Sequence, residues 1–118
     1  MIITHMKLIV KDIIGGDTAV STDDGDIVFQ KINEVIKKSE VAELDFSNIN
    51  IMTTAFLNAA IGQLYSHYTS EQLNSSLKLI NVADDDRILF KKVIERAKEF
   101  FSNKKGFEDS ANQAIYGI

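Results

Sequence analysis

The stretch LDFSNINIMTTAFLNAAIGQLY, Leu44–Tyr65, decides the fold of this chain. It begins inside Val41–Phe46 (VAELDF), a short apolar run that is typical of a central strand. Ser47–Asn50 follows as a turn-rich connection, and Thr53 or Thr54 then opens a helix. The apolar stripe of that helix consists of Leu57, Ala60, Ile61, Leu64, Tyr65 and Tyr68. The stretch therefore predicts a buried strand, a hydroxyl-bearing turn and a helix packed on the sheet.

Two further apolar runs predict neighbouring strands. Lys7–Ile14 (KLIVKDII) is rich in β-branched residues and predicts the first strand, which Gly15 and Gly16 end. Leu77–Val82 (LKLINV) predicts a third strand, and a short strand is expected within Thr18–Ser21. Strands that alternate with helices imply right-handed crossovers and a largely parallel sheet. We therefore expect an α/β fold with a mostly parallel or mixed sheet of about four strands.

Helices are also predicted on both sides of the deciding stretch, which gives three or four in total. Asp26 is placed to cap a helix whose apolar residues recur at helical spacing and which ends near Lys37. The acidic residues 84–86 lead into a long helix, because acidic side chains suit a helix start. Asn103–Gly106 is expected to stop that helix.

The length of 118 residues and the hydrophobic content of 45% fit one globular domain over 1–118. Its core is expected over 7–101, with 102–118 as a tail or an edge element and a strand over Gln113–Ile118 as one option. The net charge of −4 argues against nucleic acid as a partner. The sequence has no cysteine and no stretch apolar enough to cross a bilayer, so we expect a cytoplasmic protein without membrane contact.

The candidate catalytic and metal-binding residues do not form a known constellation. The acidic residues 84–86 lack the acidic pair that a phosphoacceptor site would need after the first strand, and helix capping explains them better. The early acidic residues, Asp17, Asp23, Asp24 and Asp26, do not have the spacing of a calcium loop. His5 and His67 stand apart from such clusters. We therefore expect no enzyme activity, no metal and no cofactor.

Leu44–Tyr65 resembles the central strand, loop and helix of STAS domains, which occur in bacterial anti-sigma-factor antagonists and in the tails of sulfate transporters. The L-D-F strand, the hydroxyl-rich turn and the alanine-containing helix carry the resemblance. Asp24-Gly25 and Asn81-Val82 fit the same pattern. The chain looks closest to a divergent STAS-like family of unknown function, and the resemblance covers roughly 7–101.

The resemblance implies a regulatory switch. In the antagonists, a kinase with a histidine-kinase-like ATPase fold, which is also the anti-sigma factor, phosphorylates a serine or threonine at the start of this helix. That position falls on Thr54 here, and Thr53 stands where the antagonists usually have aspartate. Phe56 replaces the glycine that follows in the family. A simpler interpretation is that one of the two threonines only caps the helix.

The function expected from this resemblance is protein–protein interaction, with such a kinase as partner. The interaction loop comprises Ser47, Asn48, Asn50, Met52 and Phe56. The alternative is a small-molecule or nucleotide sensor that uses the same strand-end loops, because helix starts there can bind anions. A homodimer is also considered.

Overall fold

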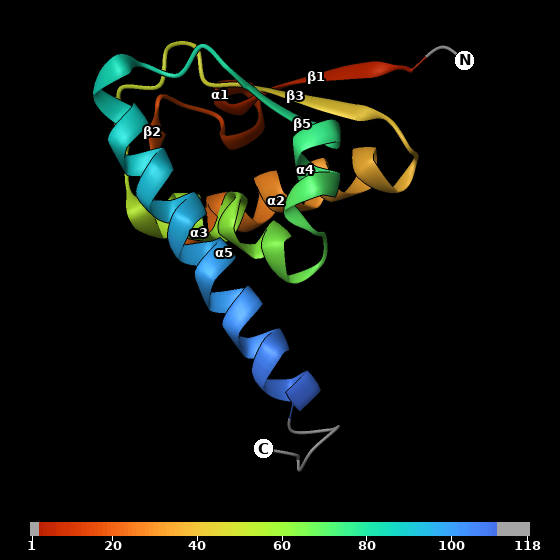
Figure 1. The fold of residues 1–118 in the computed structure, drawn as a ribbon. Helices are drawn as coiled ribbons and strands as arrows, with labels where there is room; N and C mark the ends of the chain where they lie inside the picture. The colour runs from red at the N-terminus through yellow and green to blue at the C-terminus, as the bar shows by residue number, and fades with distance from the viewer. Residues whose placement is uncertain (1–2, 111–118) are drawn as a thin grey trace.

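A computed structural model describes residues 3–110 of the chain. It is an α/β structure, as the sequence predicted, with strands and helices that alternate (Figure 1). The elements, with two short 3-10 helices named η, are β1 (His5–Ile9), α1 (Val10–Ile14), β2 (Thr18–Ala19), α2 (Thr22–Lys37), β3 (Val41–Asp45), β4 (Ile51–Met52), α3 (Thr54–Ala60), η1 (Gly62–Ser66), α4 (Ser70–Ser76), β5 (Leu77–Ile80), η2 (Asp84–Asp86) and α5 (Arg87–Ser110).

The strands form two parallel sheets. The larger sheet has the order β1-β3-β5, so the apolar run that opens the deciding stretch is its central strand, as predicted. Leu8, Leu44 and Leu79 are register partners across it. The smaller sheet pairs β2 with β4. In Figure 1, α2, α3, α4 and α5 lie on one side of the three-stranded sheet, and α5 extends beyond the rest of the fold.

The core lies between this sheet and the helices. Its largest fully buried side chains are Phe56, Ile32, Leu44, Leu57, Ile61, Leu64, Val10, Val28 and Val93. Helices α2 and α3 lie close together at Gly25. A Cβ atom at Gly25 would lie 2.5 Å from the Phe56 carbonyl oxygen and 2.6 Å from the Ala59 Cβ. Only glycine allows this contact without a shift of one helix, which explains the glycine inside α2.

The first predicted strand is too long. β1 ends at Ile9, and Val10–Ile14 form the helix α1. The Val10 side chain, the first of α1, is fully buried in the core. Gly15 ends α1 in the left-handed conformation, with φ of 77°, and its N–H donates to the Lys11 carbonyl oxygen. Gly15 therefore ends a secondary-structure element at the predicted position, but that element is a helix and not a strand.

Helix α2 begins earlier than predicted. Ser21 caps it, because the Ser21 Oγ accepts a hydrogen bond from the Asp24 N–H at 3.0 Å. The prediction that Asp26 is the cap is wrong: Asp26 lies inside the helix, where its Oδ1 accepts from the Gln63 Nε2 at 2.6 Å. A serine next to the acidic first turn satisfies the free N–H groups just as well.

The helix predicted to start at Thr53 or Thr54 is divided in two, because α3 ends at Ala60 and the 3-10 helix η1 follows. A separate helix that was not predicted, α4, comes next, and a capping box between Thr69 and Gln72 starts it. At the other end of the chain, α5 continues through Asn103–Gly106 to Ser110, so the predicted stop is wrong. The strand predicted over Gln113–Ile118 lies outside the described residues.

Candidate functional site

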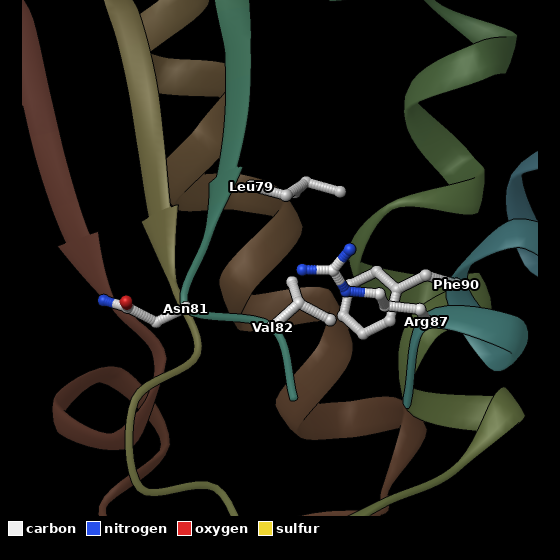
Figure 2. Close-up of a pocket in the computed structure, with 5 residues that line it drawn as sticks. All are labelled: Leu79, Asn81, Val82, Arg87 and Phe90. Carbon is white, nitrogen blue, oxygen red and sulfur yellow. The ribbon is translucent and has the colours of Figure 1, made fainter. Parts of the chain in front are cut away.

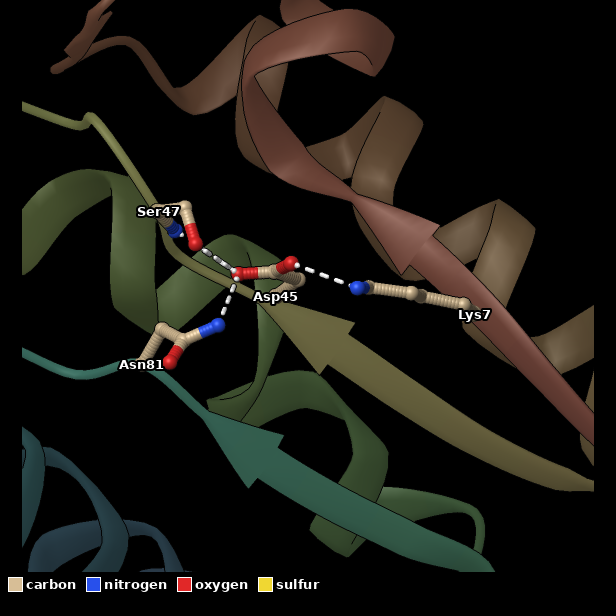
Figure 3. A network of polar contacts seen from close by, with 4 residues as sticks. All are labelled: Lys7, Asp45, Ser47 and Asn81. Carbon is tan, nitrogen blue, oxygen red and sulfur yellow. Dashed lines mark hydrogen bonds and ion pairs between the residues drawn. The ribbon is translucent and has the colours of Figure 1, made fainter.

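A buried carboxylate joins the loops that follow β3 and β5 (Figure 3). Asp45, the last residue of β3, is only 4% exposed. Its Oδ1 accepts from the Ser47 N–H at 2.9 Å, the Ser47 hydroxyl at 2.6 Å and the Asn81 Nδ2 at 3.0 Å. Its Oδ2 lies 3.3 Å from the Lys7 Nζ of β1. Side chains from the middle of β1, from the loop after β3 and from the residue after β5 therefore meet at one carboxylate.

This network keeps Asp45 ionised. Burial by itself would raise the pKa of Asp45, but the hydrogen bonds from Ser47 and Asn81 and the Lys7 ammonium hold it well below its usual range. Asn81 has a left-handed backbone, with φ of 57°, which directs the chain away from β5 while its side chain reaches Asp45. The network thus fixes how both loops leave the sheet.

The interaction loop starts at this network and is held at a second point. Ser47 is half-buried through its two bonds to Asp45, whereas Asn48 is exposed in the left-handed conformation. Asn50 is exposed too, and it donates from Nδ2 to the Asp17 Oδ2 at 2.6 Å and from its N–H to the Asp17 carbonyl oxygen at 2.8 Å. These contacts bring the loop beside the segment that follows α1.

The two threonines at the start of α3 have different roles. Thr53 is the N-cap: its Oγ1 accepts from the Phe56 N–H at 3.2 Å and donates to the Val20 carbonyl oxygen at 2.8 Å. The Thr54 hydroxyl takes part in none of the side-chain hydrogen bonds found among residues 3–101, and Thr54 is half-buried. The capping interpretation therefore applies to Thr53, and Thr54 carries the uncommitted hydroxyl.

Two predicted members of the interaction loop face inward. Phe56 is fully buried, with 0% exposure, so its inclusion in a contact surface is wrong. The reason is the helical spacing, which points Phe56 and Leu57 toward the core and against α2. Met52 is half-buried and packs against the same core. Ala55 and Asn58 are exposed on α3 and occupy the outer side instead.

A hollow that the sequence analysis did not predict lies at the end of β5. Its volume is about 600 Å³, and its lining residues are Leu79, Asn81, Val82, Arg87 and Phe90. Figure 2 shows the Arg87 guanidinium beside Val82 and Phe90, while the Asn81 side chain points away toward the neighbouring strand. Leu79 belongs to β5, and Asn81 and Val82 follow that strand. Arg87 and Phe90 lie at the start of α5, and the acidic run 84–86 connects the two groups. No local signal in the sequence marks a cavity there.

Metal-binding and membrane-spanning features are absent from the part of the chain that the structure describes. Among the side chains of residues 3–101, no group of three or more histidine, cysteine, aspartate or glutamate residues converges as a metal site would require. The Nδ1 atom of His5, in β1, instead contacts the Glu43 carboxylate of the neighbouring strand β3 at 2.8 Å. His67 lies against the ring of Phe29. Within the same residues, no helix is long and apolar enough to cross a bilayer.

The fold and the loop geometry define a class of small α/β domain, in which a central parallel strand leads into a threonine-capped helix. The sequence model of the family described as the STAS-like domain of unknown function (DUF4325) matches residues 24–87, more than half of the chain. The chain belongs to this family, as its resemblance predicted. The match runs from α2 to the start of α5 and includes Asp45, the interaction loop and α3. No curated protein and no solved structure matches the chain.

Proposed function

We propose that this STAS-like domain is a non-enzymatic regulatory module that binds another protein through the interaction loop and the start of α3. The observation that carries the proposal is the loop's construction. It is anchored at Asp45 and at Asp17, yet it leaves Asn48 and Asn50 exposed. A loop held at both ends loses little conformational entropy on binding, which favours recognition by a protein partner.

Thr54 is the proposed phosphoacceptor in this module. Its hydroxyl is uncommitted among the described residues, whereas the Thr53 hydroxyl is occupied as donor and acceptor. A phosphate on Thr54 would add a charge of about −1.5 to −2 at the docking surface and change its complementarity to a partner. The proposed kinase is an anti-sigma-type protein with a histidine-kinase-like ATPase fold, as the STAS resemblance implies.

Phosphosite mapping by mass spectrometry tests the switch on protein isolated from its native host. The proposal predicts phosphate on Thr54 and none on Thr53. Affinity capture then compares the wild type with the variant Thr54→Glu, which places a negative charge at the same position. The matched control is Ser75→Glu, because Ser75 is exposed on α4. The proposal predicts that recovery of the kinase changes with Thr54→Glu and not with Ser75→Glu; equal recovery from all three proteins contradicts it.

A second candidate function is small-molecule or nucleotide sensing, which the hollow at the end of β5 favours. Pockets of several hundred cubic ångströms at the carboxyl ends of parallel strands are common ligand sites. A ligand that binds the folded state raises the melting temperature by mass action. Thermal denaturation with nucleotides and small organic anions tests this candidate, and an unchanged melting temperature with all of them speaks against it.

A further inference from the structure

The hollow at the end of β5 combines an apolar floor with one cation. Its volume is about 600 Å³, which is in the range of small-ligand sites, and it is open to solvent on one side. Phe90 is buried and meets Phe46 edge-on, with ring centroids 4.9 Å apart. Leu79 and Val82 pack against the core. The floor is therefore held in place by the core and offers a preformed surface to a hydrocarbon or aromatic group.

Arg87 supplies the only positive charge among the lining residues. Its Nε lies 3.2 Å from the Asp84 Oδ1, but the two side chains are 71% and 92% exposed. Such an exposed pair contributes little to stability, so a ligand can replace Asp84 at small cost. The planar guanidinium can bind a carboxylate through two parallel hydrogen bonds.

The charges around Arg87 limit what kind of anion fits. Three aspartates, Asp84, Asp85 and Asp86, form η2 directly before Arg87, and Asp84 contacts the Arg87 side chain. Their negative charge opposes a polyphosphate such as ATP, which would meet one cation and three carboxylates. A single carboxylate can pair with Arg87 and place its apolar part on the floor, away from the aspartates.

We propose that this hollow binds a small organic monocarboxylate, with its carboxylate on Arg87 and its apolar body against Leu79, Val82 and Phe90. The inference rests on the sensing candidate and narrows its ligand class; it does not depend on the phosphorylation of Thr54 or on a protein partner. Asn81 also lines the hollow and binds Asp45, so the site adjoins the network that anchors the interaction loop.

The test is an NMR titration of the full chain with 3-phenylpropanoate, with 3-phenylpropan-1-ol as the uncharged analogue and ATP as the polyanion. We expect saturable shifts of the Leu79, Val82 and Phe90 amide signals with the carboxylate only. Arg87→Gln should weaken that binding about threefold, because an ion pair of a largely exposed side chain contributes up to about fivefold in affinity. Arg96→Gln, which removes an exposed arginine further along α5, should leave it unchanged.

Each other outcome overturns the inference. If 3-phenylpropan-1-ol binds as tightly as 3-phenylpropanoate, or if the Arg87→Gln variant binds 3-phenylpropanoate as tightly as the wild type does, Arg87 does not bind the carboxylate. Binding of ATP without binding of 3-phenylpropanoate excludes the monocarboxylate and leaves the sensing candidate standing. Binding of none of the three compounds counts against the sensing candidate as well.

Discussion

Replacing Asp45 with asparagine should destabilise the fold by about 2 kcal/mol at neutral pH. The variant keeps an oxygen that can accept from Ser47 and Asn81, but these hydrogen bonds lose their charge. Hydrogen bonds to charged groups contribute about 1.5–3 kcal/mol, roughly twice the neutral value. The Lys7 pair adds little to this loss, because the Lys7 side chain is 54% exposed and solvent screens the pair.

The effect should depend on pH with a defined sign. The pKa of Asp45 in the folded state lies below its value in the unfolded chain, which is about 3.9. The ionised carboxylate therefore contributes its full stabilisation above about pH 4. This contribution falls as the pH drops below that value toward the folded pKa. The difference between the wild type and Asp45→Asn should accordingly narrow in acid, by up to about 1.4 kcal/mol for each pH unit.

Urea unfolding followed by far-UV circular dichroism at pH 7 and near pH 3 measures the loss of stability in Asp45→Asn and how that loss changes with pH. Glu43→Gln is the matched control, because Glu43 is on the same strand but is half-exposed and contacts only His5 in the described side-chain bonds. Its free energy of unfolding should change by less than about 0.5 kcal/mol. The reasoning is refuted if Asp45→Asn is as stable as the wild type at pH 7, or if the difference stays constant as the pH falls.

Five further variants test the packing and the start of α3 by the same unfolding measurement. Gly25→Ala should lower the free energy of unfolding by more than about 1 kcal/mol, because the new methyl group would lie 2.5 Å from the Phe56 carbonyl oxygen. The control Gly16→Ala should be tolerated, because a Cβ atom there has nothing within 4 Å. Equal effects of the two variants would contradict the tight contact between α2 and α3. Thr53→Ala should lower the free energy of unfolding by about 1 kcal/mol through loss of the helix cap, and Thr54→Ala by less than about 0.5 kcal/mol. A larger loss for Thr54→Ala than for Thr53→Ala would contradict the assignment of Thr53 as the cap. Phe56→Ala should lower the free energy of unfolding by about 3–5 kcal/mol because the ring is fully buried, and a near-neutral result would contradict its place in the core.

Much of the sheet and of the start of α3 could be predicted from local pattern. The run Val41–Phe46 is apolar except at Glu43 and Asp45 and predicted a central strand, and β3 and β5 lie where their runs predicted. Thr53 is the kind of residue that caps a helix, and it does so. The strand prediction was wrong for Val10–Ile14, because β-branched residues favour a strand but this preference depends on the tertiary context, and the segment is helical here.

The site was less predictable, because its contacts are distant in sequence. Asp45 looks like an ordinary member of the L-D-F strand, and nothing near it indicates that Asn81, 36 positions later, donates to it. The hollow at Arg87 likewise depends on how α5 packs beside β5. The inward direction of Phe56 could have been read from helical spacing, since Phe56 is followed by the core positions Leu57 and Ala60.

Site-specific photo-crosslinking tests the central proposal, that a kinase-like ATPase docks at the start of α3. A photoreactive residue at Ala55, exposed on α3, is compared with the same residue at Asn74, exposed on α4, in the native host. The account predicts a covalent adduct with a protein of histidine-kinase-like ATPase fold from position 55 and none from position 74. No such adduct from position 55, or equal adducts from both positions, would contradict it.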